Sequence, residues 1–264
     1  MKSAIVLTFH GVVRSDSSVP LTLTSAELEY TVSASSFEQF IRQIPAHASC
    51  TVKDWKTIDI DRAIILTFDD GFISDYYTVY PLLKKYKLRG TFFVTVSNIG
   101  LDNYCNYDQL HEMLNGGMEI ASHGMTHQFL TLMTYQAACT EICGSKAELE
   151  KELKYPVSSF AAVGGHYKKW MLQAAQRAGY SSFATMIPGK SIARDEFVVL
   201  KRNHIKIHHT LDYFKKTIGA DTGIMFKNKM RYHFLNLTKR TVGYNRYDQI
   251  KHAIRKYRQL SHSA

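Results

Sequence analysis

The sequence of 264 residues contains only four cysteines and no long apolar run. No apolar stretch approaches the roughly 20 residues that a membrane-spanning helix needs. The cysteines follow neither the spacing of a zinc ribbon nor the CxxC spacing of redox proteins, so they favour free thiols in a reducing compartment. The first residues, MKSAIVLTFHGVV, include no small-residue cleavage site and predict a β-strand instead of a secretion signal. We therefore expect a cytoplasmic protein.

Acidic residues are almost missing from the C-terminal segment. Residues 224–264 contain ten Lys and Arg against one acid, Asp248, whereas the whole chain has a net charge of +10. The remainder of the chain is therefore nearly neutral. No nucleic-acid recognition motif accompanies this basic segment, so nucleic acid is not an expected partner.

The basic segment also predicts a boundary in the chain. We expect one catalytic domain over residues 1–220 and a basic helical extension over residues 221–264, formed by two helices that break near Gly243. Apolar residues recur at helical spacing in the first of these helices: Phe226, Met230, Phe234 and Leu237. This pattern favours a helix docked on its own domain, and the alternative is a helix on the inner, anionic face of a membrane.

Strand-like and helix-like runs alternate along the first 220 residues, with no internal repeat. Such alternation predicts an α/β fold, with a parallel sheet or barrel covered by helices. The run SFEQFIRQI is predicted to be an amphipathic helix capped by Ser35 or Ser36. In folds of this kind the chemistry gathers at the C-terminal ends of the strands.

The stretch AIILTFDDGF, residues 63–72, ends a buried-type strand in two adjacent carboxylates. Asp69 and Asp70 would repel each other unless a positive charge lies beside them. Gly71 permits a sharp turn at this point. The alternative is an ordinary Asp-Gly turn with two solvated acids.

A second stretch, EIASHGMTHQFL, places two histidines four residues apart directly after a short apolar strand. In a helical turn, which Ser122 could cap, this spacing puts His123 and His127 on one face, where both can bind one metal ion. Such a pair alone is more typical of surface histidines. Together with one Asp, the pair would form a three-ligand site that keeps a position open for water.

Taken together, TFDDG and SHGMTH resemble the motifs of the polysaccharide deacetylase family (NodB homology, carbohydrate esterase 4) over roughly residues 4–205. The resemblance implies a distorted (β/α) barrel of about seven parallel strands, followed here by extra C-terminal helices. It implies a hydrolase that removes N-acetyl groups from amino sugars of a polysaccharide. The missing secretion signal and the basic C-terminal segment suggest a lipid-linked or nascent glycan as the alternative substrate. Asp69 would be the catalytic base, and a divalent metal, most often zinc, would be held by Asp70, His123 and His127.

The general acid is where the sequence departs from the commonest family pattern. IVLTFH resembles the N-terminal strand of circularly permuted, exopolysaccharide-type members, which makes His10 the expected acid. The alternative for His10 is a histidine that merely ends a strand. His204 and His208, in the run NHIKIHH, are further candidates.

Two other family motifs are altered. In SFAAVGGHYKKW, the family's arginine and proline are replaced by Ala161 and Val163, and the residues that follow are expected to contact substrate unless they are only part of a loop: Gly165, His166 and Tyr167. VVLKRNHI resembles the LPRI run of permuted members, with lysine in place of proline. Arg202 is therefore expected to pair with Asp69, the alternative being a surface charge.

Two other functions fit the same residues. One is a different amide hydrolase on this scaffold, such as a sugar deformylase. The other is a carbohydrate-binding protein without activity, which the altered motifs would permit. The complete Asp-Asp-His-His set favours the enzyme.

Overall fold

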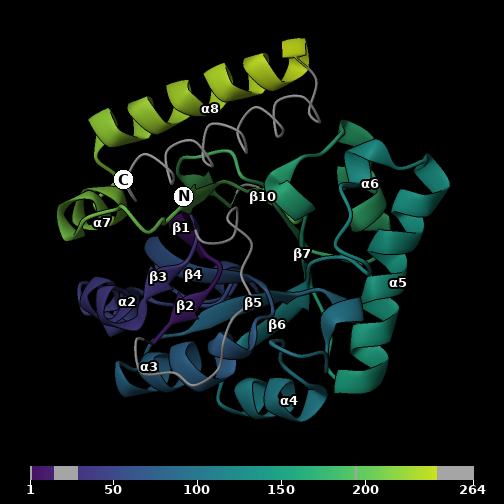
Figure 1. Ribbon diagram of the computed structural model, residues 1–264, viewed down its shortest axis with the longest axis horizontal. Helices are drawn as coiled ribbons and strands as arrows, with labels where there is room; N and C mark the ends of the chain where they lie inside the picture. The colour runs from purple at the N-terminus through teal and green to yellow at the C-terminus, as the bar shows by residue number, and fades with distance from the viewer. Residues whose placement is uncertain (1, 15–28, 194, 243–264) are drawn as a thin grey trace, which may run out of the picture.

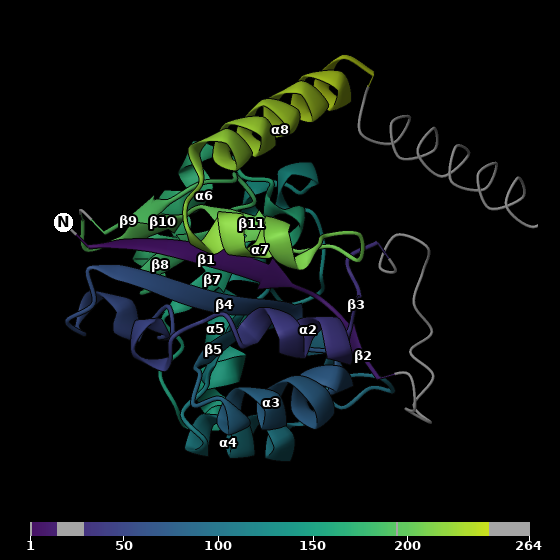
Figure 2. The same ribbon diagram turned by 90° about the vertical axis from the view of Figure 1, so that its left-hand side faces the viewer.

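The computed structural model describes residues 2–14, 29–193 and 195–242, which fold as a sheet surrounded by helices (Figures 1 and 2). The strands of the main sheet are β1 (Ser3–Phe9), β4 (Arg62–Asp70), β5 (Gly90–Val94), β6 (Glu119–Ser122), β7 (Ser159–Ala161), β8 (Ser182–Ala184), β9 (Ser191–Ile192), β10 (Val198–Leu200) and β11 (Arg202–His204). In this part of the chain eight strands run parallel in the order β10-β8-β7-β6-β5-β4-β1-β11, and β9 pairs antiparallel with β1. Strands β2 (Val12–Val13) and β3 (Val32–Ser33) form a separate parallel pair.

The sheet is nearly closed, because its two outermost strands are consecutive in the chain. Only Lys201 separates β10 from β11, although these strands lie at opposite ends of the strand order. Ser191 fixes this junction: its hydroxyl donates to the Lys201 carbonyl at 3.0 Å and accepts from the Lys201 amide at 2.9 Å. The predicted barrel is confirmed. It has eight parallel strands instead of about seven, because VVLKRNHI breaks at Lys201 into two strands.

Helices cover the outside of this sheet in both views (Figures 1 and 2). They are α2 (Ala34–Ile41), α3 (Tyr80–Lys85), α4 (Tyr107–Asn115), α5 (Tyr135–Leu153), α6 (Lys169–Arg177), α7 (Leu211–Ile218) and α8 (Thr222–Val242). Helix α2 begins two residues earlier than the sequence predicts, because the Ser33 hydroxyl, and not Ser35 or Ser36, accepts the Ser36 amide as the N-cap.

Stacked aromatic rings join α2 to the middle of the sheet. Phe68 of β4 stacks on Phe9 of β1 at 5.5 Å and on Phe92 of β5 at 4.7 Å, measured between ring centroids. Phe37 of α2 meets Phe9 edge-on at 5.2 Å, and all four side chains are fully buried. Aromatic pairs of this geometry stabilise by about 0.5–1.5 kcal/mol beyond the burial of their area. They hold β1 and β4 rigidly side by side.

The strand register aligns the ends of four neighbouring strands, β1, β4, β5 and β6. Phe9 pairs with Phe68, Asp70 with Val94, and Val94 with Ser122, each across a parallel ladder. The residues at or just beyond these ends therefore share one edge of the sheet. As the sequence predicts, they include His10, Asp69, Asp70 and His123.

Helix α8 lies across the top of the molecule in Figure 1 and is attached through α7. The Asn228 amide donates to the Tyr213 hydroxyl of α7 at 2.8 Å. The docked arrangement predicted for its apolar row is wrong: Phe226, Met230, Phe234 and Leu237 are all exposed. No helix in the described ranges is both long enough and apolar enough to cross a bilayer. The second predicted helix, after Gly243, lies outside the described residues.

Candidate active site

Three side chains from two strand ends converge on one point. Asp70 Oδ1 lies 2.9 Å from His127 Nε2 and 3.4 Å from His123 Nε2. One ligand atom from each residue can be chosen so that all three lie within 4.8 Å of one another, the only such group of three found among the described His, Cys, Asp and Glu residues. One carboxylate and two imidazoles suit a zinc, iron, cobalt or nickel ion. The three predicted ligands are brought together.

His123 is oriented by the neighbouring strand. Its Nδ1 lies 2.9 Å from the Ala161 carbonyl at the end of β7, and a carbonyl can only accept, so Nδ1 carries the proton. Nε2 is then the free lone pair that faces Asp70. Burial lowers the pKa of His123, which keeps the ring neutral although Asp69 and Asp70 act in the opposite direction. A neutral imidazole held by a carbonyl at its second nitrogen is the form that binds a metal.

The two histidines do not lie on a helix, which corrects the sequence prediction. Residues 123–127 form a loop, in which Gly124 has a φ of +88° and His127 a φ of +56°. Ser122 does not cap a helix; its hydroxyl accepts from the Gly124 amide at 3.2 Å and supports the turn. The left-handed residues bring His127 back towards Asp70, whereas a helical turn would carry the chain away from the sheet.

Glu141 of α5, which sequence reasoning missed, holds this loop in place. Its Oε2 accepts from the amides of Met125 and Thr126 at 2.8 and 2.9 Å, and its Oε1 accepts from the Thr126 hydroxyl at 2.5 Å. The carboxylate is buried, so these charge-assisted bonds are shielded from water. Glu141 is therefore a positioning residue between the two histidine ligands. The signal available in the sequence for this role was an acidic residue at a buried position of an amphipathic helix.

Asp69 is paired with Arg202, as predicted. The two terminal guanidinium nitrogens donate to the two carboxylate oxygens at 2.6 and 2.9 Å. Burial alone would raise the pKa of Asp69, but the charge and hydrogen bonds of Arg202 outweigh it and hold that pKa below its usual range. Asp69 is thus ionised and fixed in direction.

Arg202 is itself fully buried, so it is not the surface charge of the alternative interpretation. Its Nε donates to the Thr185 carbonyl at 3.1 Å, and its guanidinium lies over the Phe93 ring at 5.3 Å. These two contacts fix the orientation of the guanidinium in addition to its pairing with Asp69.

His10 follows β1 directly, next to the end of β4. Because Phe9 pairs with Phe68 across the parallel ladder, His10 lies level with Asp69 just beyond the end of β1. Its Nδ1 is buried without a hydrogen-bond partner, and its ring lies 5.2 Å from Tyr30 and 5.9 Å from His204. Its role as the general acid stays a prediction.

The two further acid candidates differ in position. His204 stacks beside His10, and burial lowers its pKa far below the ordinary value, which opposes its use as a charged acid. His208 is exposed, and its neighbours are His209, Lys206 and Arg231. Of the three, His10 is the one that lies level with Asp69 in the strand register, whereas His204 pairs with Thr8.

The residues predicted to contact substrate have mixed surroundings. Gly165 is buried with a φ of +69°, and a Cβ there would lie 2.1 Å from Met186 Cγ, so the glycine allows a close approach of two loops. Tyr167 packs against Phe183 at 5.6 Å, whereas His166 lies near Phe129 at 6.0 Å. Contact of these residues with substrate stays a prediction.

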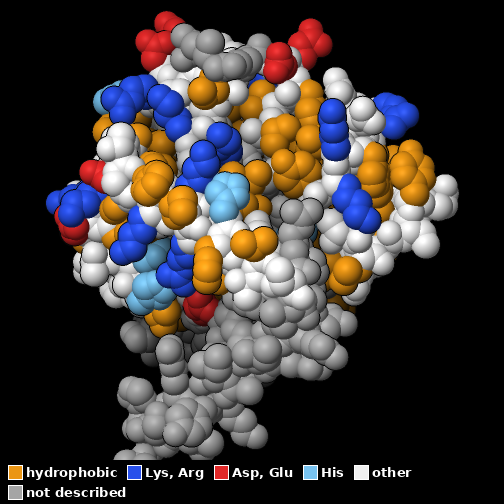
Figure 3. Space-filling model, turned by 90° about the horizontal axis from the view of Figure 1, so that it is seen from above, with side chains coloured by type: hydrophobic (Ala, Val, Ile, Leu, Met, Phe, Trp, Pro, Cys, Tyr) orange, Lys and Arg blue, Asp and Glu red, His pale blue; other side chains and the backbone are white. Residues whose placement is uncertain are grey.

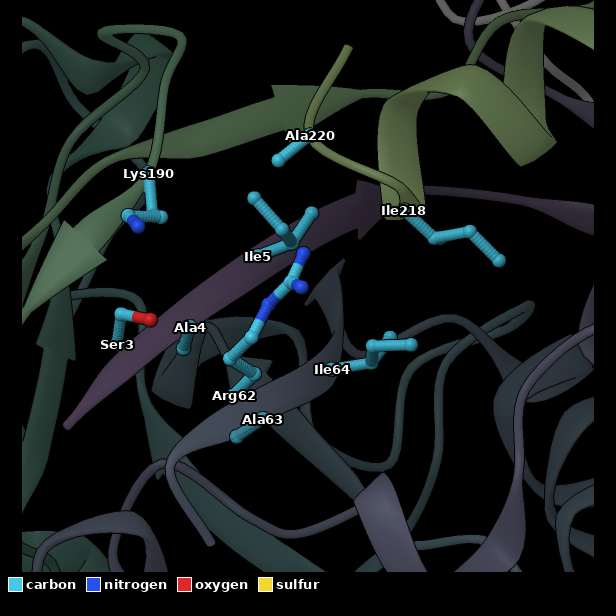
Figure 4. A pocket seen from close by; sticks show the side chains of 9 residues that line it. All are labelled: Ser3, Ala4, Ile5, Arg62, Ala63, Ile64, Lys190, Ile218 and Ala220. Carbon is cyan, nitrogen blue, oxygen red and sulfur yellow. The ribbon is translucent and has the colours of Figure 1, made fainter.

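A hollow of about 220 Å³ lies at the opposite, amino ends of β1 and β4, between the strands and the end of α7. Arg62 extends into it beside Ile5 (Figure 4). Its lining contains no carboxylate and no imidazole: Ser3, Ala4, Ile5, Arg62, Ala63, Ile64, Lys190, Ile218 and Ala220. It is separate from the candidate active site.

Solved structures share the fold. The deacetylase PplD of Streptococcus pyogenes, solved with acetate, aligns with a TM-score of 0.70 at 23% identity over 82% of this chain and 98% of that one. IcaB of Ammonifex degensii aligns with a TM-score of 0.65 at 19% identity over 83% and 97%. At these identities the likeness concerns the fold, which agrees with the nearly closed barrel described above.

Sequence comparison gives the family. A poly-β-1,6-N-acetyl-D-glucosamine N-deacetylase of Staphylococcus aureus is 31% identical over 147 residues, 49% of this chain and 50% of that protein. YxkH of Bacillus subtilis, whose name places it among the polysaccharide deacetylases, is 31% identical over 136 residues, 52% of this chain and 48% of that protein. The chain thus spans about half the length of the curated relatives it matches. Residues 57–183, which contain the Asp-Asp pair and both metal-site histidines, match the family model for polysaccharide deacetylase, and this part of the chain belongs to that family.

Proposed function

We propose that the chain is a metal-dependent hydrolase that removes N-acetyl groups from amino sugars of a polysaccharide or a lipid-linked glycan. One observation carries the proposal: the cluster of Asp70, His123 and His127 lies at the same strand ends as an ionised, immobilised Asp69. The match to the deacetylase family and to a relative named for poly-β-1,6-N-acetyl-D-glucosamine supports the substrate class.

The donor set fits a divalent cation. Burial would raise the pKa of Asp70, but the surrounding histidines, with the hydrogen bond of His127 as the largest effect, hold it below its usual range. His123 is neutral with Nε2 free, and His127 is partly exposed at the open side. A divalent metal, with zinc as the first choice for two imidazoles and a carboxylate, would supply Lewis acidity towards water and the amide carbonyl.

Asp69 acts as the general base in this proposal. It accepts one proton from the attacking water while the water oxygen forms a bond to the carbonyl carbon of the N-acetyl group. Because Arg202 lowers the basicity of Asp69, this step works only on a water that is already acidified. Arg202 also prevents the carboxylate from rotating, so its oxygen stays aimed at one position.

His10 supplies the second proton. When the carbon–nitrogen bond breaks, the amino group leaves and takes the proton of His10, and acetate is the other product. The position of His10 directly after β1, level with Asp69 in the strand register, supports this role. Asp69 returns its proton to His10 or to solvent before the next cycle.

The test is acetate release from N-acetylated chitooligosaccharides and from poly-β-1,6-N-acetyl-D-glucosamine, after loading the protein with zinc. Asp69→Asn should lower kcat by at least about 10³-fold while zinc stays bound, since base catalysis alone contributes about 10²–10⁴-fold. Asp212→Asn, which changes an exposed aspartate of α7, is the matched control and should retain wild-type activity.

Formate release from N-formylated sugars without acetate release would favour the deformylase alternative. Glycan binding without any product, in protein shown to contain metal, would favour the inactive carbohydrate-binding protein. An active Asp69→Asn variant would remove the assignment of the base.

We also propose that the protein works in the cytoplasm. All four cysteines are free thiols, which is typical of proteins in a reducing compartment. Recovery of the native protein from a periplasmic or culture fraction would overturn this location.

A further inference from the structure

Helix α8 presents a row of large apolar side chains to solvent. Phe226, Met230, Phe234 and Leu237 are 67%, 54%, 69% and 62% exposed. Their spacing of four, four and three residues places them along one side of the helix. The opposite side is partly covered and includes Asn228, which bonds to α7. Because the opposite side of α8 contacts α7, the apolar row faces solvent.

The same helix has charge of only one sign. Residues 222–242 contain five Lys and Arg and no acid. Lys227, Lys229 and Arg231 are exposed among the apolar residues, and none of them has an ion pair within the described part of the chain. Figure 3 shows this face, with basic and hydrophobic side chains over its centre and acidic ones mainly around its margin.

Charge decides which partner suits this face. A second copy of the helix would bring five positive charges against five more, which opposes self-association. An anionic lipid surface complements every one of these charges, and Lys and Arg beside an apolar row can extend towards phosphate headgroups. The sequence after α8 adds five more basic residues against Asp248 alone, which extends the charge in the same sense.

We infer that α8 binds the surface of an anionic lipid bilayer, lying in the plane of the interface with the row from Phe226 to Leu237 turned into the headgroup region. This is the arrangement typical of helices with a basic polar side and Phe or Leu on the other. The inference concerns a partner beyond the proposed hydrolysis and does not depend on it. A helix that lies on a bilayer need not be long or apolar enough to cross it.

The test is sedimentation of the full-length protein with phosphatidylcholine vesicles, with and without 30% phosphatidylglycerol (about a third anionic lipid, enough to give a strongly negative surface). The wild type should bind the anionic vesicles and not the neutral ones. Phe226→Ser/Phe234→Ser should lower the partition coefficient at least about tenfold, because two buried aromatic side chains are lost from the interface. Lys227→Glu/Lys229→Glu should lower it by a similar factor.

Leu101→Ser/Leu132→Ser is the matched control, since both leucines are as exposed as the phenylalanines and neither lies on α8. This control should bind like the wild type, and all variants should keep the wild-type melting temperature. Equal binding by the phenylalanine variant and the wild type would overturn the inference, as would an absence of binding to anionic vesicles. A concentration-dependent dimer in sedimentation velocity, lost in the phenylalanine variant and unaccompanied by vesicle binding, would assign the face to a second copy and also overturn it.

Discussion

Arg202 and Asp69 lie 133 residues apart in the chain and form a fully buried, two-pronged ion pair. One partner ends a central strand and the other begins the strand next to β1. Because neither charge can reach water, each depends on the other for its solvation.

Removing one partner should therefore be costly. Arg202→Gln should lower the free energy of unfolding by about 3–5 kcal/mol, because it leaves a buried carboxylate without a counter-charge. Adding Asp69→Asn should restore much of this loss, so the double variant should be more stable than the sum of the two single effects. Urea denaturation in EDTA, followed by circular dichroism, measures this coupling. Simple additivity of the two substitutions would contradict it.

Metal binding should depend on His127 although that residue is the most exposed of the three ligands. We expect the wild type to bind one zinc ion and His127→Gln to bind it more than about 100-fold more weakly, since loss even of a supporting contact costs about 10–100-fold. Competition with a chromophoric chelator measures both affinities. His111→Gln, on α4, is the control and should bind zinc like the wild type. Unchanged affinity in His127→Gln would exclude this residue as a ligand.

Glu141 should affect the site without touching a metal. Glu141→Ala removes the acceptor for two amides and one hydroxyl of the histidine loop, so zinc affinity should fall by about 10–100-fold. Hydrogen exchange at the amides of Met125 and Thr126 should become faster in the metal-free protein. Glu148→Ala, at a more exposed position of the same helix, should change neither quantity. Slow exchange retained in Glu141→Ala would show that other contacts fix the loop.

Acid should weaken the fold through His209. Burial lowers the pKa of His209 to about 3, and its ring stacks on Tyr213 at 3.8 Å. In the unfolded chain a histidine takes up its proton near pH 6.5, so between these values the unfolded state binds more protons than the folded state. The stability is therefore fully present above about pH 6.5 and falls as the pH decreases.

The measurement compares melting temperatures at pH 7 and pH 5. His209→Phe keeps the stacking and removes the titration, so its decrease should be smaller than that of the wild type by about 1–3 °C. His47→Phe, at an exposed position, should behave like the wild type. An unchanged pH dependence in His209→Phe would assign the acid sensitivity to other groups.

The sequence predicts the site well where strands decide the geometry. The run before Asp69 reads as a buried strand, and parallel pairing through β5 then places its end at the same sheet edge as the end of β6. The partnership of Arg202 with Asp69 followed only from the family resemblance. Local pattern could not reveal it, because the pair spans most of the domain.

The sequence predicts the site less well where the backbone conformation of a loop determines the positions of the side chains. A spacing of four between His123 and His127 suits a helix, but Gly124 and His127 adopt positive φ values and produce a loop. Helical periodicity likewise identified the apolar row of α8 without telling whether protein would cover it. Periodicity reports that one side of a helix differs from the other; what lies opposite depends on contacts distant in the chain.

The late position of β11 in the chain, directly after β10 and Lys201, has a consequence for biosynthesis. Arg202 both begins the last parallel strand and completes the charge balance at Asp69, so this carboxylate has no counter-ion until more than three quarters of the chain has left the ribosome. Until then the nascent protein exposes the unpaired side of β1 and an uncompensated acid. The synthesis of Arg202 thus allows the barrel to close and the ion pair with Asp69 to form at the same stage. A chain truncated before residue 202 should accumulate as a chaperone-bound or degraded species.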